Sequence, residues 1–431
     1  MEEQCDFINE QRIRQELHEA KDAGPDTVRK LIDKALDLKG LTTAEAAVLL
    51  QVDDHSVVKE MMHAAGAIKD RLFGPRIVLY APLYLSNECC NNCLYCSFRR
   101  DNTLEQRKTL TVDEIAAEAR VLVNQGQTIA LLVSGEDPAK SNIEYLLEAV
   151  KAVYATGIER VDMEVAPLSV VDLVRLKEAG VGTLVLFQET YHLETYKMMH
   201  PTGMKANYKW RLSAMDRAMQ AGFRDIGLGA LFGLYEYKFE VMGLLGHALH
   251  LTQHYGVGPR TICIPRLRPA LGTVLKNPPY PVSDFDFKKL IAVMKLALPF
   301  TGICLSTREL PALREELLDA GIVQISAGSR TNPGGYAGKE RHDEEQFHIE
   351  DGRSVEEMSI VIGEKGFLPS FCTNCFSSKR NGEKWLECAR QEIMPDICSA
   401  QAVESLRRFR EKCRPEQLPR LDTIIDKFGN W

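Results

Sequence analysis

Long apolar runs are missing from this chain of 431 residues. The most apolar stretch, KLIAVMKLALPF (289–300), contains two lysines, and it is far shorter than the roughly 20 residues that a membrane-spanning helix needs. The first residues, MEEQCDFINEQ, are acidic and have no apolar core, so they do not resemble a secretory signal. We therefore expect a cytoplasmic protein with no membrane segment.

An excess of basic residues is missing as well. The formal net charge is −7, from 53 Lys and Arg against 60 Asp and Glu. The hydrophobic fraction of 45% and the charged fraction of 26% are those of an ordinary soluble globular protein. Because broad nucleic-acid binding normally requires a basic face, we expect no nucleic-acid partner.

A complete GxGxxG dinucleotide-binding fingerprint is missing after the first predicted strand, which weakens the case for an open doubly wound sheet. From about residue 76 the chain alternates short β-rich runs with amphipathic helical segments. The eight predicted strands are 76–85, 128–136, 160–166, 183–189, 225–233, 261–267, 302–307 and 322–328. Eight such units predict an α/β fold, a closed (β/α)8 barrel of the TIM type.

Helical segments flank the predicted barrel. Apolar residues in QRIRQELHEA and TVRKLIDKALDL recur every three or four positions, so residues 1–72 are expected to form a helical N-terminal cover. The barrel is expected over 73–350, with the polar segment 334–348 leading out of it, and a helical C-terminal extension over 351–431. Capping boxes predict helix starts at Thr111 with Glu114 and at Ser141 with Glu144.

Four loops after predicted strands carry candidate functional residues. They are the cysteine-rich segment after the first strand, SGED (134–137) after the second, QETYH (188–192) after the fourth and SAGSRTNPGGY (326–336) after the eighth. Barrels of this kind carry their chemistry on the loops at the C-terminal ends of the strands. We therefore expect all four loops to lie at one rim of the barrel.

The twelve cysteines are distributed unevenly. One group comprises Cys89, Cys90, Cys93 and Cys96, and a second comprises Cys372, Cys375, Cys388 and Cys398. Clustered cysteines in a reducing compartment are more typical of metal ligands than of disulfides. The other four, Cys5, Cys263, Cys304 and Cys413, are isolated in the sequence. They are expected to be buried small side chains or inert surface thiols.

The first cysteine group contains a set of three. Without Cys90, the spacing is Cys89-x3-Cys93-x2-Cys96. A zinc ribbon prefers two separated CxxC pairs, and no fourth ligand is obvious nearby, although a structural zinc or a redox pair remains the alternative. Three thiolates fit a [4Fe–4S] cluster in which one iron has no protein ligand. An open coordination position indicates catalysis.

This spacing after the first strand of a barrel, with Tyr95 just before the last cysteine, resembles the radical S-adenosylmethionine (SAM) superfamily. The resemblance implies that the open iron binds SAM and that one electron from the cluster cleaves SAM to a 5′-deoxyadenosyl radical. It implies that Cys90 is a bystander. It further implies SAM contacts from Tyr95 and from Ser134, Gly135 and Glu136 of the SGED loop. Glu164 and Glu189, at strand ends, either face SAM or are rim carboxylates that are solvated or paired with a basic residue.

The second cysteine group contains another set of three, Cys372-x2-Cys375-x22-Cys398. A second cluster with an open iron and a structural zinc that uses Cys388 as fourth ligand are both consistent with this spacing. The segments PLYLSNECCNNCLYCSFRRDN, LFQETYHLETYKMMHPTG, QISAGSRTNPGGY and PSFCTNCF, together with the distal spacing, resemble the tyrosine lyase family of [FeFe]-hydrogenase maturation (HydG). The related thiazole-pathway tyrosine lyase shares the first motif but lacks the second-cluster tail.

The HydG resemblance implies a reaction and its participants. The radical would abstract hydrogen from L-tyrosine and the Cα–Cβ bond would break to p-cresol and dehydroglycine, with later conversion to CO and cyanide at the second [4Fe–4S] cluster. An external electron donor and hydrogenase-maturation partners are implied as well. On physical grounds, Arg330 could bind the substrate carboxylate in a bidentate manner, with Ser326 and Ser329 as hydroxyl donors. An arginine that only closes the barrel end or pairs with an acid is the alternative.

The sequence departs from the HydG pattern at one position. The family has a histidine that ligates an extra iron at the second cluster, within a segment resembling GVGPxTISxPR. Here the segment reads GVGPRTICIPR, with Arg260 at the histidine position and Cys263 where serine is usual. Arginine has no lone pair to offer a metal, so the extra iron lacks this ligand unless His254 or Cys263 replaces it.

The leading interpretation is therefore a radical SAM carbon–carbon lyase that acts on tyrosine or a similar amino acid. Two outcomes remain open within it, an iron–CO–cyanide product for hydrogenase assembly and a paralogue that stops at dehydroglycine or makes another product. A non-catalytic iron–sulfur scaffold is the alternative from another class.

Overall fold

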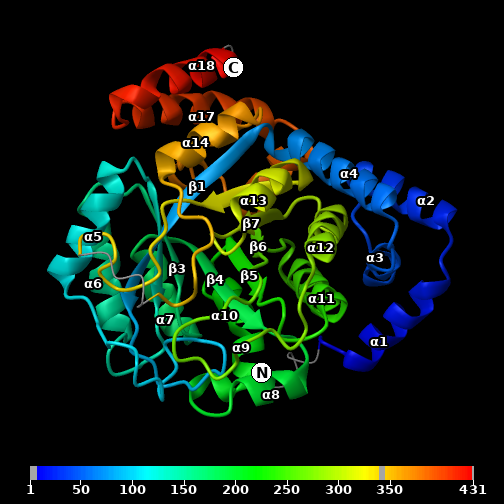
Figure 1. Ribbon diagram of the computed structural model, residues 1–431, viewed down its shortest axis with the longest axis horizontal. Coiled ribbons are helices and arrows are strands. Elements are labelled where there is room, and N and C mark those ends of the chain that lie inside the picture. The colour runs from blue at the N-terminus through cyan, green and yellow to red at the C-terminus, as the bar shows by residue number, and fades with distance from the viewer. Residues whose placement is uncertain (1–6, 339–344, 430–431) are drawn as a thin grey trace.

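Eight parallel strands form a closed barrel in the computed structural model, which describes residues 7–338 and 345–429 (Figure 1). The strand order is β2-β3-β4-β5-β6-β7-β8-β1, and β1 also pairs with β2, which closes the barrel. The strands are β1 (Arg76–Ser86), β2 (Ile129–Ser134), β3 (Arg160–Glu164), β4 (Val181–Glu189), β5 (Ile226–Ala230), β6 (Thr261–Cys263), β7 (Gly302–Leu305) and β8 (Ile322–Ser326). The predicted (β/α)8 barrel is confirmed.

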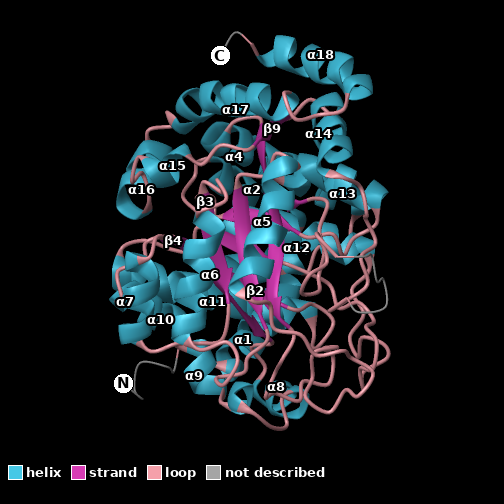
Figure 2. Ribbon diagram, turned by 90° about the vertical axis from the view of Figure 1, so that its left-hand side faces the viewer, coloured by secondary structure: helices cyan, strands magenta, loops and turns pink. Residues whose placement is uncertain are grey.

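Helices surround the barrel, as Figure 2 shows. The helices that connect successive strands are α5 (Val112–Asn124), α6 (Ile143–Tyr154), α7 (Val170–Glu178), α8 (Leu193–Met199), α9 (Tyr208–Leu212), α10 (Ala214–Gln220), α11 (Tyr237–Tyr255), α12 (Asp284–Ala297) and α13 (Pro311–Leu317). Their apolar residues and those of the strands form one continuous buried core. This shell fixes the strands, so the loops at the strand ends are held in place.

Two further groups of helices lie outside the strand–helix repeats. Before the barrel come α1 (Glu10–Glu19), α2 (Pro25–Leu36), α3 (Thr43–Leu50) and α4 (His55–Phe73). After it come α14 (Val355–Glu364), α15 (Asn374–Ser377), α16 (Gly382–Arg390), α17 (Met394–Arg410) and α18 (Leu418–Phe428). In Figure 1, α1 to α3 lie on one side of the barrel, and α14, α17 and α18 lie beyond the start of β1. Cys5 and residues 339–344 of the predicted 334–348 loop lie outside the described residues.

A ninth strand, β9 (Leu368–Ser370), was not predicted. It pairs in parallel with Arg76–Val78, the first residues of β1. Val78 also pairs with Gln324 of β8, so β8 and β9 lie on opposite edges of β1. β1 begins to pair with β2 only at Ala81. The first residues of β1 therefore have an unpaired edge on that side, and β9 pairs with it. The pairing brings the second cysteine group to the N-terminal end of the barrel.

One of the two predicted capping boxes is confirmed and the other is wrong. Thr111 accepts from the backbone N–H of Glu114, and the Glu114 side chain accepts from Thr111 in return. The cap of α6 is Asn142 rather than Ser141, since its side chain accepts from the backbone N–H of Tyr145. Ser141 instead donates to the carbonyl oxygens of Gly135 and Asp137, and so folds the SGED loop back on itself.

Candidate active site

The first cysteine group lies in the loop between β1 and α5, at the C-terminal end of the barrel. Arg107 holds this loop by donating to the carbonyl oxygens of Asn87, Phe98 and Arg99. The Asn87 side chain accepts from the backbone N–H of Lys108 at 2.6 Å. The cysteines are thus carried on a loop whose backbone is tied at several points.

Cys89, Cys93 and Cys96 face one another across this loop. Burial raises the pKa of Cys89 to about 12 and also raises the pKa values of Cys93 and Cys96, and repulsion from neighbouring thiolates adds to the shift for Cys89 and Cys93. As free groups they are therefore neutral thiols, and a metal cluster that binds them must displace their protons. Among residues 7–338 and 345–429, no three His, Cys, Asp or Glu side chains are placed to hold one single metal ion. Thiolates around a four-iron cluster bind different irons and stand farther apart, so the trio fits a cluster better than one ion.

The SGED loop packs directly on the cysteine loop. The backbone N–H of Gly135 donates to the carbonyl oxygen of Ser86 at 2.8 Å, and the N–H of Cys90 donates to that of Glu136 at 3.0 Å. A Cβ atom on Gly135 would lie 2.3 Å from the carbonyl oxygen of Glu88, so a side chain here would force the two loops apart. The Ser134 hydroxyl donates to the carbonyl oxygen of Gly135. The structure therefore brings the predicted SAM loop and the cysteine trio together.

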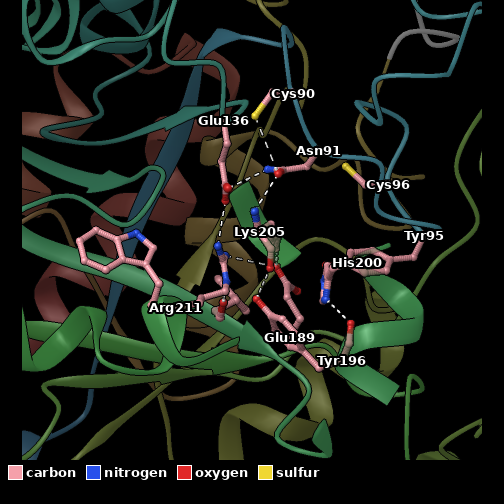
Figure 3. A network of polar contacts seen from close by, with 12 residues as sticks. Cys90, Asn91, Tyr95, Cys96, Glu136, Glu189, Tyr196, His200, Lys205 and Arg211 are labelled. Carbon is pink, nitrogen blue, oxygen red and sulfur yellow. Dashed lines mark hydrogen bonds and ion pairs between the residues drawn. The ribbon is translucent and has the colours of Figure 1, made fainter. Parts of the chain in front are cut away.

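Glu136 and Glu189 are joined by a network of buried charges, drawn in Figure 3. Arg211 donates to Glu136 at 2.8 Å and lies 3.6 Å from Glu189. Lys205 donates to Glu189 at 2.6 Å, and the Asn91 amide donates to the second oxygen of Glu136 at 2.8 Å. Burial alone would raise the pKa of Glu136, but the charges of Arg211 and Lys205 hold it below its usual value. Glu189 is thus paired with a basic residue, one of the alternatives that the sequence left open for it, and Glu136, predicted as a SAM contact, is paired in the same way.

Glu189 also has an unusual backbone conformation. Its φ of 71° lies in the left-handed region, which side chains other than glycine rarely adopt, and the pairing of β4 with β5 shifts register at this residue. Such backbone strain is concentrated at functional sites. The conformation turns the Glu189 carboxylate toward Lys205 at the mouth of the barrel.

We expect Arg211→Met to destabilise the protein by about 3–5 kcal/mol, because it leaves two buried carboxylates without their shared cation. The Arg211 side chain is only 4% exposed. The free energy of unfolding in urea, measured anaerobically, tests this. Arg29→Met is the matched control, since Arg29 is 65% exposed and lies 3.9 Å from Asp26. It should change stability by less than about 0.5 kcal/mol, and equal losses in the two variants would contradict a stabilising role for the network.

Glu164 differs from the other two acids. It ends β3, borders the cavity described below, and has no hydrogen bond or ion pair among the described residues. Burial, together with repulsion from Glu189, raises its pKa to about 7. Glu164 is therefore a carboxylate still available to a cationic ligand.

Tyr95 lies beside the cysteine trio and hydrogen-bonds His200, with 2.8 Å between the Tyr95 hydroxyl and Nε2 (Figure 3). The Nδ1 atom of His200 lies 2.8 Å from the carbonyl oxygen of Tyr196, which can only accept. Nδ1 therefore carries the proton and Nε2 accepts from Tyr95. Burial lowers the pKa of His200 well below its usual value, so the ring is neutral. This pair fixes the orientation of the Tyr95 ring at the cavity wall.

One cavity runs through the barrel from one cysteine group to the other. Its lining includes Tyr95 and Cys96 at one end and Cys372 and Cys375 at the other. Strands contribute the wall between them, among them Tyr80 of β1. A small molecule formed near the first group could therefore reach the second without leaving the barrel.

The loop after β8 contributes two of its three predicted substrate residues to this cavity. Ser326 and Ser329 both border it, and the buried Ser329 hydroxyl has no hydrogen-bond partner among the described residues. Arg330 is not among the lining residues, and its Nη1 donates to the carbonyl oxygen of Ser329 at 3.4 Å. Arg308 does border the cavity, stacked 3.4 Å from the ring centroid of Phe347. Arg308 is thus the arginine that faces the space between the serines and the cysteine trio.

The second cysteine group gathers at the N-terminal end of the barrel. Cys372 follows β9, Cys375 lies in α15 and Cys398 in α17. The proximity of Cys398 and of Arg76 lowers the pKa of Cys375, and both Cys375 and Cys398 interact electrostatically with Cys372. Cys388 lies in α16, outside the predicted set of three. The structure therefore brings the three cysteines of the distal pattern together, and the four-thiol zinc site remains the alternative.

Arginines surround this second trio. Arg76, Arg160 and Arg260 all border the same end of the cavity and interact electrostatically with Cys375. The Arg260 guanidinium stacks on Trp385, with 3.7 Å between its carbon and the ring centroid. His254 is not among the cavity-lining residues and bonds the carbonyl oxygen of His250 within α11, whereas Cys263 borders the cavity. The residues present at position 260 and around it do not fit an extra iron held by a histidine.

The sequence interpretation missed four polar residues of this site, Lys205, Arg211, His200 and Arg308. The first three follow the QETYH loop within 20 residues, in a segment that carries no spacing motif. Arg308 follows β7, in STRE (306–309), and only its position after a barrel strand could have indicated it. No helix in the described residues is long and apolar enough to cross a membrane.

Comparisons with known proteins agree with this geometry. Residues 83–245 match the radical SAM superfamily and residues 263–368 match the biotin and thiamin synthesis associated domain. The chain is 35% identical to the 2-iminoacetate synthase of Escherichia coli (strain K12), over 78% of this chain and 89% of that protein.

Two solved structures are similar over nearly the whole chain. A crystal structure of HydG, a maturase of the [FeFe]-hydrogenase, superimposes with a TM-score of 0.95 at 44% identity, and covers 99% of this chain and 94% of that one. HydG from Carboxydothermus hydrogenoformans superimposes with a TM-score of 0.87 at 38% identity and the same coverage. Both similarities extend over the C-terminal helices that carry the second cysteine trio.

Proposed function

Because this chain belongs to the radical SAM superfamily, as an amino-acid lyase of the type that includes HydG and 2-iminoacetate synthase, we propose that it cleaves the Cα–Cβ bond of L-tyrosine to p-cresol and dehydroglycine. The observation that carries the proposal is the cavity that joins the two cysteine trios through the barrel. The full-length similarity to HydG supports the same assignment. Membership of the superfamily implies a [4Fe–4S] cluster and SAM, and we propose Cys89, Cys93 and Cys96 as the cluster ligands.

When bound, the first cluster and SAM would supply the 5′-deoxyadenosyl radical that starts the reaction. The chain itself has to hold SAM and tyrosine close together and in the correct relative orientation. We assign the backbone of Ser134–Asp137 and the free carboxylate of Glu164 to SAM, since both lie beside the cysteine trio or at the cavity wall. Glu136 and Glu189 act indirectly, because their oxygens are engaged by Arg211, Asn91 and Lys205.

Tyrosine carries a carboxylate, and the cavity offers it a cation and hydroxyls. Arg308 and the Ser329 hydroxyl, which has no hydrogen-bond partner within residues 7–338 and 345–429, face the same space, with Ser326 next to them. A guanidinium can bind a carboxylate through two parallel hydrogen bonds. We therefore propose Arg308 with Ser326 and Ser329 as the substrate-binding set, and Arg330 remains the sequence-based candidate.

We further propose that Cys372, Cys375 and Cys398 hold a second [4Fe–4S] cluster, at which dehydroglycine is processed. The three arginines around this trio give the cavity end a positive charge suited to a carboxylate fragment. Whether the chain goes on to make CO and cyanide for hydrogenase assembly turns on Arg260, which offers no metal ligand. Arg260 favours the second outcome, a lyase that stops at dehydroglycine or a related product.

We expect SAM binding to weaken as the pH falls through about 7, because Glu164 then becomes protonated and loses its attraction for the SAM ammonium group. For a group with this pKa, affinity should be about tenfold lower at pH 6 than at pH 8. Calorimetry with the oxidised enzyme at both pH values measures this. The Glu164→Gln variant should bind weakly at both, while Glu144→Gln, whose side chain on α6 is 69% exposed, should behave like the wild type. A pH dependence that persists in Glu164→Gln would exclude Glu164 as the contact.

Product analysis of the anaerobically reconstituted enzyme tests the proposed reaction. With SAM, a low-potential reductant and tyrosine, we expect equal amounts of 5′-deoxyadenosine and p-cresol, and glyoxylate from hydrolysis of dehydroglycine. CO and cyanide should be absent or minor if Arg260 has changed the outcome. Formation of 5′-deoxyadenosine without p-cresol would exclude tyrosine as substrate. The absence of 5′-deoxyadenosine would exclude the enzyme and leave the scaffold hypothesis.

A further inference from the structure

Two cysteines that are isolated in the sequence lie side by side in the wall of the cavity. Cys263 is the last residue of β6 and Cys304 lies in β7, and the two are direct partners in the parallel register of these strands. Both side chains border the cavity, and Cys263 packs against the buried cluster that contains Cys304 and Tyr80. Cys304 is buried, as the sequence predicted, but the two thiols are neighbours in space although they are isolated in the sequence.

A phenol completes the group. The Tyr80 hydroxyl lies 3.2 Å from the Sγ atom of Cys304, and Tyr80 borders the cavity from β1. Tyr80 is itself the register partner of Ser326, one of the predicted substrate residues. Two thiols and one phenol thus converge at the middle of the barrel, between the two cysteine trios. Neither cluster nor the proposed lyase reaction uses them.

The spacing of these atoms suits a shared metal ion. A tetrahedral ion with bonds of about 2.3 Å to sulfur and about 2.0 Å to oxygen places such ligands roughly 3.5 Å apart. The 3.2 Å between Tyr80 and Cys304 is within a few tenths of an ångström of that separation. Cys304 and Tyr80 are 5% and 8% exposed, whereas Cys263 is more exposed because it faces the cavity. An ion held here would keep one position open toward the cavity.

The charges of the group indicate the class of ion. Thiolates select transition metals over magnesium and calcium, which prefer oxygen ligands. Two thiols that lose their protons on binding would balance a divalent ion, so the buried site would carry no net charge. The Glu164 carboxylate interacts electrostatically with both Tyr80 and Cys263. Its negative charge would therefore favour a cation bound by these two residues and Cys304.

We propose that Cys263, Cys304 and Tyr80 form a binding site for one thiophilic divalent transition-metal ion, such as Fe²⁺ or Zn²⁺, inside the barrel and apart from both cysteine trios. The site goes beyond the proposed lyase reaction, and it requires neither SAM nor turnover. Its open position would face the passage between the trios, where a small ligand could bind the ion.

Cobalt is the probe that tests this proposal. High-spin Co²⁺ gives an EPR signal that oxidised [4Fe–4S]²⁺ clusters do not, so it can be counted in the intact, cluster-loaded enzyme. We expect one tightly bound Co²⁺ per chain, with a thiolate-to-cobalt charge-transfer band in the near ultraviolet. The Cys263→Ser/Cys304→Ser double variant should lose this ion or bind it at least tenfold more weakly, and Tyr80→Phe should have a smaller effect. Cys413→Ser, a cysteine of the C-terminal extension outside the cavity, should bind cobalt like the wild type.

Either of two results on cobalt uptake would overturn the proposal. One is no cobalt uptake by the wild type, and the other is equal uptake by the double variant, which would place the ion elsewhere. X-ray absorption of the cobalt-loaded wild type needs no variant and should show two sulfur ligands at about 2.3 Å. A shell of nitrogen and oxygen alone would assign the thiols a purely packing role. None of these measurements uses tyrosine. Failure of the lyase proposal would therefore not affect the metal-site proposal, and failure of the metal-site proposal would not affect the lyase proposal.

Discussion

Replacing Cys96 with alanine should abolish the formation of 5′-deoxyadenosine from SAM. Cys96 is the member of the first trio that borders the cavity, beside Tyr95. The Cys-x3-Cys-x2-Cys pattern contains no other cysteine that could replace it as a ligand. With only two thiols left, the loop between β1 and α5 should not retain a [4Fe–4S] cluster. We expect a loss of more than about a hundredfold, since even outer partners of metal ligands cost 10–100-fold when removed. Chromatography of the reaction mixture, with dithionite as reductant, measures the product.

Cys90→Ala is the matched control for this experiment. Cys90 lies in the same loop, but its thiol donates to the side chain of Asn91 at 3.9 Å rather than facing the trio. The backbone bond from Cys90 to Glu136 survives the substitution. We expect near wild-type iron content and 5′-deoxyadenosine. If Cys90→Ala were as inactive as Cys96→Ala, the assignment of Cys89, Cys93 and Cys96 as the ligand set would be wrong.

The barrel could be predicted from the sequence because its signal is local and repeated. Each strand is a short apolar run, and each following helix has its own amphipathic period and end signals. Eight repeats of this pattern leave few alternatives. β9 escaped prediction because three residues, Leu368–Ser370, have too little length for a pattern, and they form a strand only where β1 leaves an edge unpaired.

The cysteine trios could be predicted for a different reason, which is that ligand spacing in a loop is itself the chemical signal. The residues that surround them could not. Lys205 and Arg211 come about 70 residues after Glu136, and their pairing depends on how the segment 204–212, which includes α9, packs beside Glu136 and Glu189. Nothing in the sequence distinguishes these two basic residues from the many solvated ones.

The pair Cys263 and Cys304 shows the same limit. The two lie 41 residues apart, and their contact follows from the register between β6 and β7, which sequence alone does not fix. The same limit applies to the substrate site. Arg308 and Arg330 both follow barrel strands, and only the packing of the folded chain determines which of them faces the cavity. The sequence thus indicates which chemistry to look for, and the register indicates which side chains can take part.

Replacing Cys375 with alanine should separate the two halves of the reaction. Cys375 belongs to the second trio, at the start of β1, whereas the SAM loop lies at the other end of this 11-residue strand, about 33 Å away along it. We therefore expect 5′-deoxyadenosine and p-cresol at near wild-type rates, while any product made from dehydroglycine at the second cluster disappears and glyoxylate accumulates. Iron content should fall by about half, because one of two clusters is lost.

Cys388→Ala, in the neighbouring α16, is the control that should leave both products and iron unchanged. A Cys375→Ala variant that cannot form p-cresol would show that the two ends of the cavity are not independent, and a Cys388→Ala variant that loses iron would support the four-thiol alternative.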